Sequence, residues 1–285
     1  VTLESIADAV VTTDREGCIR FINVNASALS GLSVDQARGR RLSELFEFEH
    51  DESRRDSEEV IRSLLEQQRV LNGTSSWSLT NAEGDSRVVQ YTAAPTFDRA
   101  GGLVGGIVVL HDITEAWAME RQLSYQATHD ALTGLINRRE FEARLGEAIT
   151  LGREFGHQHL LCYIDLDQFK IVNDTCGHLA GDELLRQISR VIGECLRPHD
   201  ALARLGGDEF GVILRECAVD DGLGIAEEIR QRVRAFRFPW RGRQFALGTS
   251  IGAVRLDDDC DDLQEVLGQA DTACYASKEH GRNCV

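Results

Sequence analysis

Hydrophobic and polar residues alternate in short runs over the first 113 residues, and this pattern predicts mainly β-strands. Strand-like runs at 9–13 and 18–23 flank a turn at 14–17 that ends in glycine, so they predict a hairpin. Three further strands are expected at 73–80, 86–93 and 103–111. Before them, residues 33–71 carry charged, helix-compatible sequence with one apolar stripe. The stripe consists of Val60, Ile61, Leu64 and Leu65.

The predicted elements follow the order of a known type of domain: two strands, then helices, then a three-stranded meander. The stretch from Ile6 to Ala26 and the later sequence His111-Asp-Ile-Thr-Glu115 also fit it. In these features residues 1–113 resemble a PAS domain. The resemblance implies a PAS-like sensory or dimerising module. This part of the chain carries no cofactor signature, so the ligand of the module is unknown.

Residues 114–128 have the pattern of one helix. Asp112 or Thr114 can cap its start, and no Gly or Pro interrupts it before Gly134. A candidate seam consists of Ala116, Met119, Leu123 and Gln126. Their spacings of three, four and three are those of a short a/d seam, and an amphipathic surface helix fits equally well. The sharper hypothesis is a helical linker that transmits the geometry of a PAS dimer.

Residues 129–285 alternate between helical and strand patterns. The run Leu160–Asp167 is apolar without a break until Asp165, as expected of a buried central strand. The other expected elements are a helix with Phe141, Leu145, Ala148 and Ile149 on one face, a helix over 182–195, a hairpin of 201–205 and 210–214, a helix over 220–235, a hairpin at Arg241-Gly242, a strand over 245–256 and a helix over 263–278. This order predicts a ferredoxin-like antiparallel sheet with helices, and the whole chain is predicted to be α+β.

Length and charge restrict the class of protein. The 285 residues suffice for two domains, and no apolar run approaches the ~20 residues that span a bilayer. A formal net charge of −16 argues against a nucleic-acid-binding surface, so phosphate chemistry would need a metal ion and a few local cations. Because the chain starts with Val1 rather than Met, we expect a piece of a longer protein, whose other parts could include a membrane anchor.

The 8 cysteines are scattered, without a CxxC pair or the spacing of metal ligands. Several lie in apolar runs, such as Cys162, where a free cysteine packs as a small hydrophobic residue. This usage predicts reduced thiols and a cytoplasmic location.

The candidate chemistry centres on residues 204–214. Gly206 and Gly207 interrupt a strand pattern, which predicts a two-residue hairpin turn carrying Asp208 and Glu209. Asp165 ends the buried strand, where an isolated charge is costly, and the hairpin can pair beside it. Oxygen ligands of this kind suit Mg²⁺. A structural Ca²⁺ site and an acidic surface hairpin are the alternatives.

Five motifs follow one another in this second half. They are His129-Asp-x-Leu-Thr-Gly-Leu-x-Asn-Arg138, Asp165-x-Asp-x-Phe-Lys-x-x-Asn-Asp174, Gly177-His178-x-x-Gly181-Asp182, Gly206-Gly-Asp-Glu-Phe210 and Ala270-Asp-x-Ala-x-Tyr-x-x-Lys278-x-x-Gly-Arg282-Asn283. In order and spacing they resemble the motifs of GGDEF-type diguanylate cyclases, over residues 129–285. The resemblance implies condensation of two GTP molecules into cyclic di-GMP, release of pyrophosphate, and a need for Mg²⁺ or Mn²⁺.

The resemblance also implies roles for individual residues. The metal ligands would be Asp165, the carbonyl of Leu166 and Asp208. The catalytic residues would be Asp208, Glu209 and Asp165, with Glu209 steering or accepting a proton. The substrate would be held by Asn173 and Asp182 at the guanine, and at the phosphates by the N–H groups of Phe169 and Lys170 and the side chains of Lys278 and Arg282.

Arg197-Pro-His-Asp200 precedes the glycine pair by the five residues 201–205. In the family that the chain resembles, an Arg-x-x-Asp at this spacing is a product-inhibition site, so Arg197 and Asp200 would bind cyclic di-GMP. A second arginine, Arg230 or Arg234, would complete the site. The alternative is a helix-end turn in which Arg197 offsets the carbonyl end of the preceding helix.

Each domain of this type holds one GTP, so synthesis implies a homodimer through the PAS-like part, the linker and facing GGDEF domains. The PAS-like domain and the product would then regulate activity. One rival is a GTP-binding regulatory module that controls an adjacent phosphodiesterase domain outside this sequence. Another is a sensor or dimerisation scaffold that binds no GTP.

Overall fold

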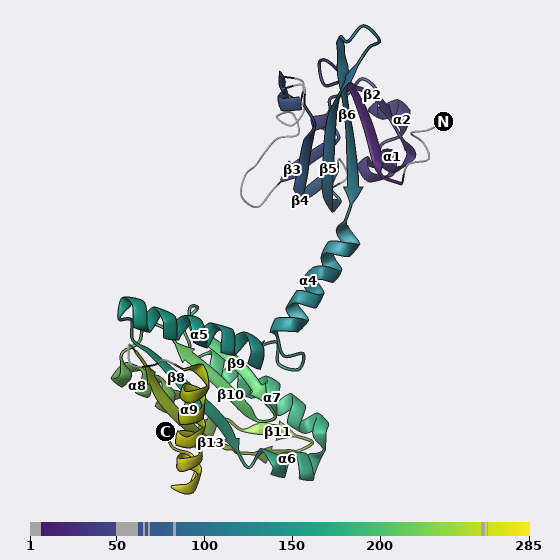
Figure 1. Ribbon diagram of the computed structural model, residues 1–285. Helices are drawn as coiled ribbons and strands as arrows, with labels where there is room; N and C mark the ends of the chain where they lie inside the picture. Colours follow the sequence, from purple (N-terminus) through teal and green to yellow (C-terminus); the bar gives the residue numbers. More distant parts are fainter. Residues whose placement is uncertain are drawn as a thin grey trace. The chain divides into compact units, whose positions relative to one another are not determined.

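The chain divides into two compact units, Val1–Gln122 and Leu123–Val285, each with its own sheet and hydrophobic core (Figure 1). The computed structural model describes residues 7–49, 62–64, 66–67, 69–81, 84–257, 260 and 262–285. Among these residues, no helix has the length and apolarity needed to cross a membrane.

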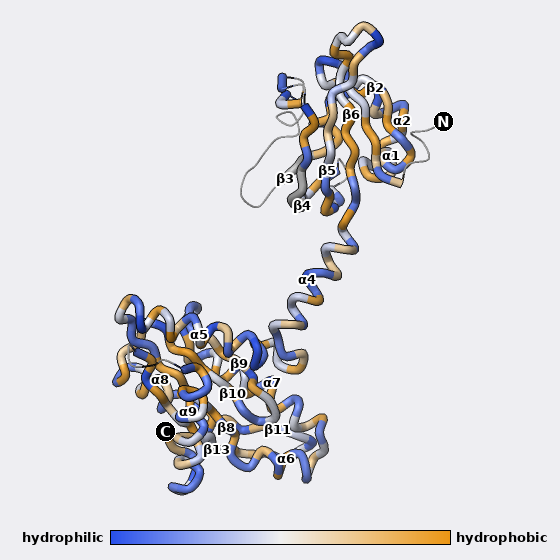
Figure 2. Tube along the Cα trace, viewed as in Figure 1, coloured by the Kyte–Doolittle hydropathy of each residue, from blue (hydrophilic) through white to orange (hydrophobic). Residues whose placement is uncertain are grey.

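The first unit is built on a six-stranded antiparallel sheet with the strand order β2-β1-β6-β5-β4-β3. Its elements are β1 (Ala9–Asp14), β2 (Ile19–Ile22), α1 (Val24–Ser30), α2 (Val34–Ala37), the 3-10 helix η1 (Leu42–Glu44), β3 (Phe46–Glu49), β4 (Leu71–Asn81), β5 (Ser86–Phe97) and β6 (Leu103–Asp112). Hydrophobic residues concentrate along β1 and β6 (Figure 2), where Val11 and Leu110 are fully buried. The predicted hairpin and three-stranded meander are confirmed.

The helical expectation for residues 33–71 is wrong at β3. This strand pairs with β4, with Phe46 opposite Asn81, and the Phe46 side chain is 1% exposed. Pairing with a strand more than thirty residues away overrides local helix compatibility there. Of the predicted apolar stripe, Leu64 is fully buried, and Val60, Ile61 and Leu65 lie outside the described residues.

Helix α4 (Thr114–Thr128) occupies the range expected of the linker. The Asp112 carboxylate accepts the N–H of Thr114 at 2.9 Å, which satisfies one of the free donors at the helix start. No residue of α4 is buried, and Met119 and Leu123 of the candidate seam are 66% and 60% exposed. Its role in signal transmission stays a prediction.

The second unit is built on a five-stranded sheet with the order β13-β8-β10-β9-β7, in which only the β7–β9 pair is parallel. Its strands are β7 (Ile136–Asn137), β8 (His159–Asp167), β9 (Ala201–Gly206), β10 (Glu209–Leu214) and β13 (Gly248–Leu256), and β11 (Phe238–Trp240) pairs with β12 (Arg243–Phe245) separately. Its helices are α5 (Arg138–Phe155), α6 (Phe169–Cys176), α7 (His178–Gly193), α8 (Val219–Ala235) and α9 (Leu263–Glu279). The predicted ferredoxin-like order is confirmed.

Residues of β8 alternate between two cores because successive side chains point to opposite faces of a sheet. Cys162 and Ile164 pack with residues of α6, α7 and α8, whereas Leu161 and Tyr163 pack with residues of α5 and α9. All nine residues of β8 are buried, as predicted for a central strand. Asp165 and Asp167 at the end of β8 therefore lie where the buried strand reaches the candidate site.

Two boundaries in this unit differ from the predicted ones. The helix expected from residue 182 begins at His178, and a separate helix, α6, precedes it. Gly177, with φ of 83°, makes the break between the two helices, because L-residues other than glycine rarely adopt that conformation. The predicted strand over 245–256 begins only at Gly248, since Phe245 pairs with Phe238 in the small hairpin.

Candidate functional site

The glycine pair lies in a β-hairpin whose turn is shifted by one residue from the predicted one. Gly206 ends β9 and pairs with Glu209, which begins β10, so Gly207 and Asp208 form the turn. Gly206 and Gly207 have φ of 146° and 52°, and a Cβ at either position would meet no atom within 4 Å. Asp208 thus lies at the turn, as expected, whereas Glu209 belongs to the strand.

The sheet register brings Asp165 beside this hairpin. Glu209 pairs directly with Asp165 across β10 and β8, and cross-strand partners project from the same face. The backbone N–H of Leu166 donates to the carbonyl of Asp208 at 3.2 Å, which ties the turn to the end of β8. Residues more than forty positions apart are gathered at one edge of the sheet, as the motifs predicted.

One lysine faces this group of carboxylates. Lys278 Nζ lies 2.6 Å from Asp165 Oδ2. Burial raises the pKa of Asp165; Lys278 opposes that shift, and Asp208 and Glu209 add to it. Burial alone would lower the pKa of Lys278, but the hydrogen bond and charge of Asp165 raise it. Lys278 and Arg138, whose guanidinium lies 3.4 Å from Glu209, therefore do not fully compensate the three carboxylates at this edge.

The donor set fits a Mg²⁺-type ion. The nearest candidates are the Asp165 and Asp208 carboxylates and the Leu166 carbonyl, all hard oxygen donors. Within the described part of the chain, no three His, Cys, Asp or Glu side chains gather closely enough to hold a metal by themselves. Mg²⁺ suits such a partial set, because it keeps waters and takes substrate phosphate oxygens as further ligands.

Asn173 of α6, expected at the guanine, packs against Gly181 of α7, the residue before Asp182. A Cβ at Gly181 would lie 1.9 Å from Asn173 Oδ1, so this glycine lets the amide of α6 approach α7 one residue before Asp182. Asn173 Oδ1 is buried and has no hydrogen-bond partner among the described residues. A buried acceptor of this kind needs a donor, and a bound base edge can provide one.

The expected phosphate contacts come from two elements. Phe169 and Lys170 are the first residues of α6, where backbone N–H groups lack an intrahelical acceptor and attract anions. Arg282 follows α9 with φ of 64°, and its N–H donates to the Ser277 carbonyl at 3.1 Å. Its side chain is exposed, whereas that of Lys278 contacts Asp165.

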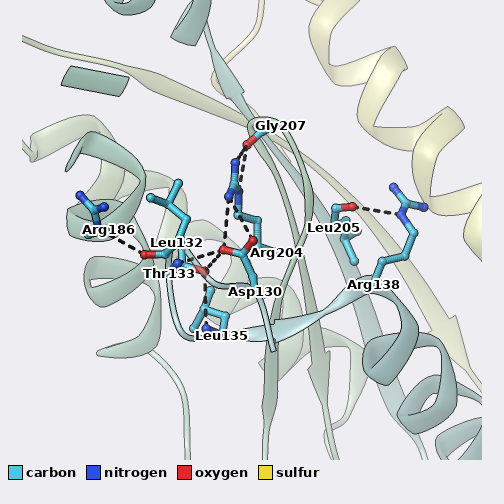
Figure 3. Close-up of polar contacts among 9 residues, drawn as sticks. All are labelled: Asp130, Leu132, Thr133, Leu135, Arg138, Arg186, Arg204, Leu205 and Gly207. Atoms are coloured by element: carbon cyan, nitrogen blue, oxygen red, sulfur yellow. Dashed lines mark hydrogen bonds and ion pairs between the residues drawn. The ribbon is translucent and has the colours of Figure 1, made fainter. Parts of the chain in front are cut away.

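Arg204 joins the turn to the segment that follows α4. Its guanidinium lies 3.2 Å from both carboxylate oxygens of Asp130 and donates to the Gly207 carbonyl at 2.9 and 3.1 Å (Figure 3). Burial alone would raise the pKa of Asp130, but Thr133 and Arg204 lower it. Sequence reasoning missed this contact, because only the fold brings Asp130 and Arg204 together.

Comparison with known proteins identifies the family. Residues 127–284 match the family model described as the GGDEF domain of diguanylate cyclases. The chain belongs to the GGDEF diguanylate cyclase family. Residues 3–117 match the model described as a PAS fold.

Two curated relatives align with the whole GGDEF-family chain. A probable diguanylate cyclase of Escherichia coli, DgcE, is 40% identical over 290 residues, and a cyclic di-GMP phosphodiesterase of Shewanella oneidensis, PdeB, is 32% identical over 288 residues. The alignments cover 100% of this chain but 26% and 32% of those proteins, so the chain spans about a third or less of their length.

A solved structure supports the same fold for the GGDEF unit. The coiled coil and GGDEF domain of DgcB from Caulobacter crescentus, in complex with c-di-GMP, is 34% identical with a TM-score of 0.57. The match covers 61% of this chain and 92% of that one.

Asp167 is a second residue beside the candidate site to which sequence reasoning gave no role. It is 6% exposed, accepts the Ser250 hydroxyl at 2.8 Å and accepts the N–H of Asn283 at 2.9 Å. It therefore anchors the C-terminal segment that carries Arg282. The alternation Asp-x-Asp at the end of β8 was the available signal, because both carboxylates face the same side.

The Arg197–Asp200 turn lies at the opposite end of the same strands. The Asp200 carboxylate accepts the N–H of Arg197 at 2.8 Å and of Arg215 at 3.1 Å, and its side chain is 2% exposed. The Arg197 residue itself is exposed. Asp200 thus organises the turn, which is the structural alternative, and ligand binding by the pair stays a prediction.

The arginines of α8 differ in their distance from that turn. Arg230 binds Glu227 and the Asn283 carbonyl, whereas Arg232 lies 3.5 Å from Glu194, three residues before Arg197. By these contacts Arg232 lies near the turn, and the prediction that Arg230 or Arg234 completes a product site stays a prediction.

Proposed function

We propose that the GGDEF unit condenses two GTP molecules into cyclic di-GMP and releases pyrophosphate. The observation that carries the proposal is the meeting of Asp165, Asp208 and Glu209 at one sheet edge, where Lys278 and Arg138 do not balance the three carboxylates. The similarity to DgcE over the whole chain supports the same function.

Each residue of this edge then has a task. Asp165, Asp208 and the Leu166 carbonyl would hold Mg²⁺ or Mn²⁺, which when bound polarises the α-phosphoryl group and lowers the pKa of the attacking 3′-hydroxyl. Glu209 is placed to steer or accept the proton of that hydroxyl. Lys278 would turn from Asp165 to phosphate oxygens once a metal neutralises the carboxylate.

The substrate contacts follow from the same geometry. The amide of Asn173 and the carboxylate of Asp182 would bind the guanine edge, because together they offer a donor and acceptors to its polar groups. The first N–H groups of α6, at Phe169 and Lys170, and the side chain of Arg282 would hold the phosphates.

Product inhibition is proposed at Arg197. Its guanidinium would grip a phosphate or a guanine edge, Asp200 would hold the turn and accept from the base, and Arg232 would add a second cation. This site lies at the other end of the sheet from the metal edge, so the product would act without entering the catalytic site.

A homodimer is proposed because each GGDEF unit holds one GTP. The exposed seam of α4 supports dimerisation through the linker, with the PAS unit as the regulator. The eight free cysteines support a cytoplasmic, reducing setting.

Inserting residues after Gln122 tests the linker. Four residues shift an a/d seam out of phase, whereas seven restore it. We expect cyclic di-GMP synthesis to change severalfold more with four residues than with seven. Equal effects of both insertions would make α4 a passive tether.

The central test is incubation of the purified chain with GTP and Mg²⁺, with the product identified by mass spectrometry. Formation of cyclic di-GMP supports the proposal. Binding of GTP without product would favour a regulatory module next to a phosphodiesterase domain, a rival that the similarity to PdeB supports. Absence of GTP binding would favour a scaffold.

A further inference from the structure

Arg138 is held at a defined place beside the catalytic hairpin. It is the first residue of α5, whose start is capped by the Asn137 side chain, and β7 pairs with β9 immediately before it. Its Nε donates to the Leu205 carbonyl at 3.0 Å (Figure 3), which anchors the guanidinium against β9. A terminal nitrogen of the same group then lies 3.4 Å from Glu209 Oε2.

Tyr163 on β8 is a second neighbour of Glu209. Tyr163 lies two residues before Asp165 on β8, so both side chains are on the face to which Glu209 also projects. The Tyr163 residue is 6% exposed, and its direct cross-strand partners on both neighbouring strands are glycines, Gly211 and Gly252. Burial raises the pKa of Tyr163, and the nearby Glu209 carboxylate raises it further, while Arg138 opposes both.

The Glu209 carboxylate is therefore flanked by a guanidinium anchored on β9 and by a buried phenol on β8. An unrestrained glutamate samples many rotamers, and its side chain here is 34% exposed, so solvent alone would not order it. Neither neighbour is a metal ligand or a substrate contact in the proposed function. Arg138 donates to the carboxylate of Glu209, the first residue of β10, at 3.4 Å, and Tyr163 lies diagonally across the β8–β10 pair from it on the same face.

We propose that Arg138 and Tyr163 are positioning residues that hold the Glu209 carboxylate over the metal edge formed by Asp165 and Asp208. The proposal rests on the proposed cyclase function, and it deepens the role of Glu209 in it. Tyr163 acts from inside the core and Arg138 from the hairpin side. Loss of either leaves the metal ligands in place but lets Glu209 leave the position in which it acts.

A structural role for both residues is the competing explanation. Arg138 also braces the hairpin through Leu205, and Tyr163 also packs in the core with Phe141. The test therefore uses Tyr163→Phe, which keeps the ring and removes only the hydroxyl, and Arg138→Gln, which keeps a donor for Leu205 without the charge. Tyr125→Phe and Arg139→Gln are matched controls, because the Tyr125 hydroxyl donates to the Gly134 carbonyl away from Glu209 and Arg139 is an exposed neighbour of Arg138.

Two readouts are measured on the full chain. The first is kcat and KM for GTP, and the second is Mn²⁺ affinity by electron paramagnetic resonance with a GTP analogue that cannot be cleaved. We expect each variant to lose about tenfold in kcat, with KM unchanged, because neither residue contacts GTP. We also expect about a tenfold loss in Mn²⁺ affinity, because the negative charge of Glu209 then lies farther from the cation although the metal ligands stay in place. The melting temperature of Tyr163→Phe should stay near that of the unaltered chain.

A double-mutant cycle with Glu209→Gln decides between the two roles. If Tyr163 acts through Glu209, adding Tyr163→Phe to Glu209→Gln should have no further effect on either readout. Wild-type values for Tyr163→Phe, or an undiminished effect in the Glu209→Gln background, would overturn the proposal. If the unaltered chain makes no cyclic di-GMP but the variants still weaken Mn²⁺ binding through Glu209, the cyclase function fails and the positioning role stands.

Discussion

The two ends of the GGDEF sheet each carry a mostly buried aspartate, and the two are satisfied in different ways. Asp165 shares one lysine with two further carboxylates, and burial raises its pKa. Asp200 is enclosed by two backbone N–H groups, at 2.8 and 3.1 Å, and needs no further partner. An aspartate whose carboxylate is satisfied by neighbouring backbone N–H groups holds a turn, whereas one whose charge is left undercompensated is available to a metal ion.

The largest effect should come from the metal edge. Asp208→Ala removes a proposed metal ligand from the hairpin turn, so cyclic di-GMP synthesis should fall by roughly a thousandfold or more, since a metal supplies several kcal/mol of transition-state stabilisation. The fold should persist, because Asp208 lies in an open turn. Initial rates and thermal melting check both statements, with the exposed Glu154→Ala as control. Near-normal turnover would remove Asp208 from the metal site.

Asp200→Ala should act on stability instead. It leaves the N–H groups of Arg197 and Arg215 without an acceptor, which should cost about 1–3 kcal/mol of unfolding free energy. Urea denaturation measures the loss, and Asp200→Asn, which keeps one acceptor oxygen, should lose less. Unchanged stability combined with lost cyclic di-GMP affinity would show that Asp200 is a ligand-binding residue. The contrast between Asp165 and Asp200 would then be wrong.

Arg197→Ala should separate product binding from stability at that same turn. The exposed side chain contributes little to folding, but its charged hydrogen bonds to product should be worth about tenfold or more in affinity. Calorimetry with cyclic di-GMP and progress curves check this, with the exposed Arg190→Ala as control. Inhibition and affinity equal to those of the unaltered chain would return Arg197 to the helix-end role.

The smallest effect concerns Asp130, which braces the catalytic turn through Arg204. Because Thr133 and Arg204 lower the pKa of Asp130 in the folded state, its ionised form stabilises the fold above the unfolded pKa of about 3.9, and this contribution disappears as pH falls through the folded value. Asp130→Asn should therefore cost about 1 kcal/mol near neutral pH, after solvent screening, and almost nothing at strongly acidic pH. Unfolding free energies at several pH values measure the difference. If the loss of unfolding free energy in Asp130→Asn were the same at every pH, the effect would come from the packing of the side chain and not from its charge.

Sequence patterns located most of the site and the fold, but not every contact. Strand β8 was predicted because it is apolar until Asp165, and the hairpin was predicted because glycines interrupt a strand. β3 was missed because a four-residue strand has little local signal and depends on its pairing with β4. The turn was misplaced by one residue, since two adjacent glycines do not specify which of them begins it.

By itself, the sequence determined the two-part organisation and the types of ligand that each motif suits, because period and residue chemistry are local properties. Tertiary structure alone decided which charges meet. The register of β8 with β10 places Glu209 opposite Asp165, and the packing of α9 brings Lys278 to the same edge. It also decided that Asp200 faces backbone donors, since burial and hydrogen-bond partners depend on segments far apart in the chain.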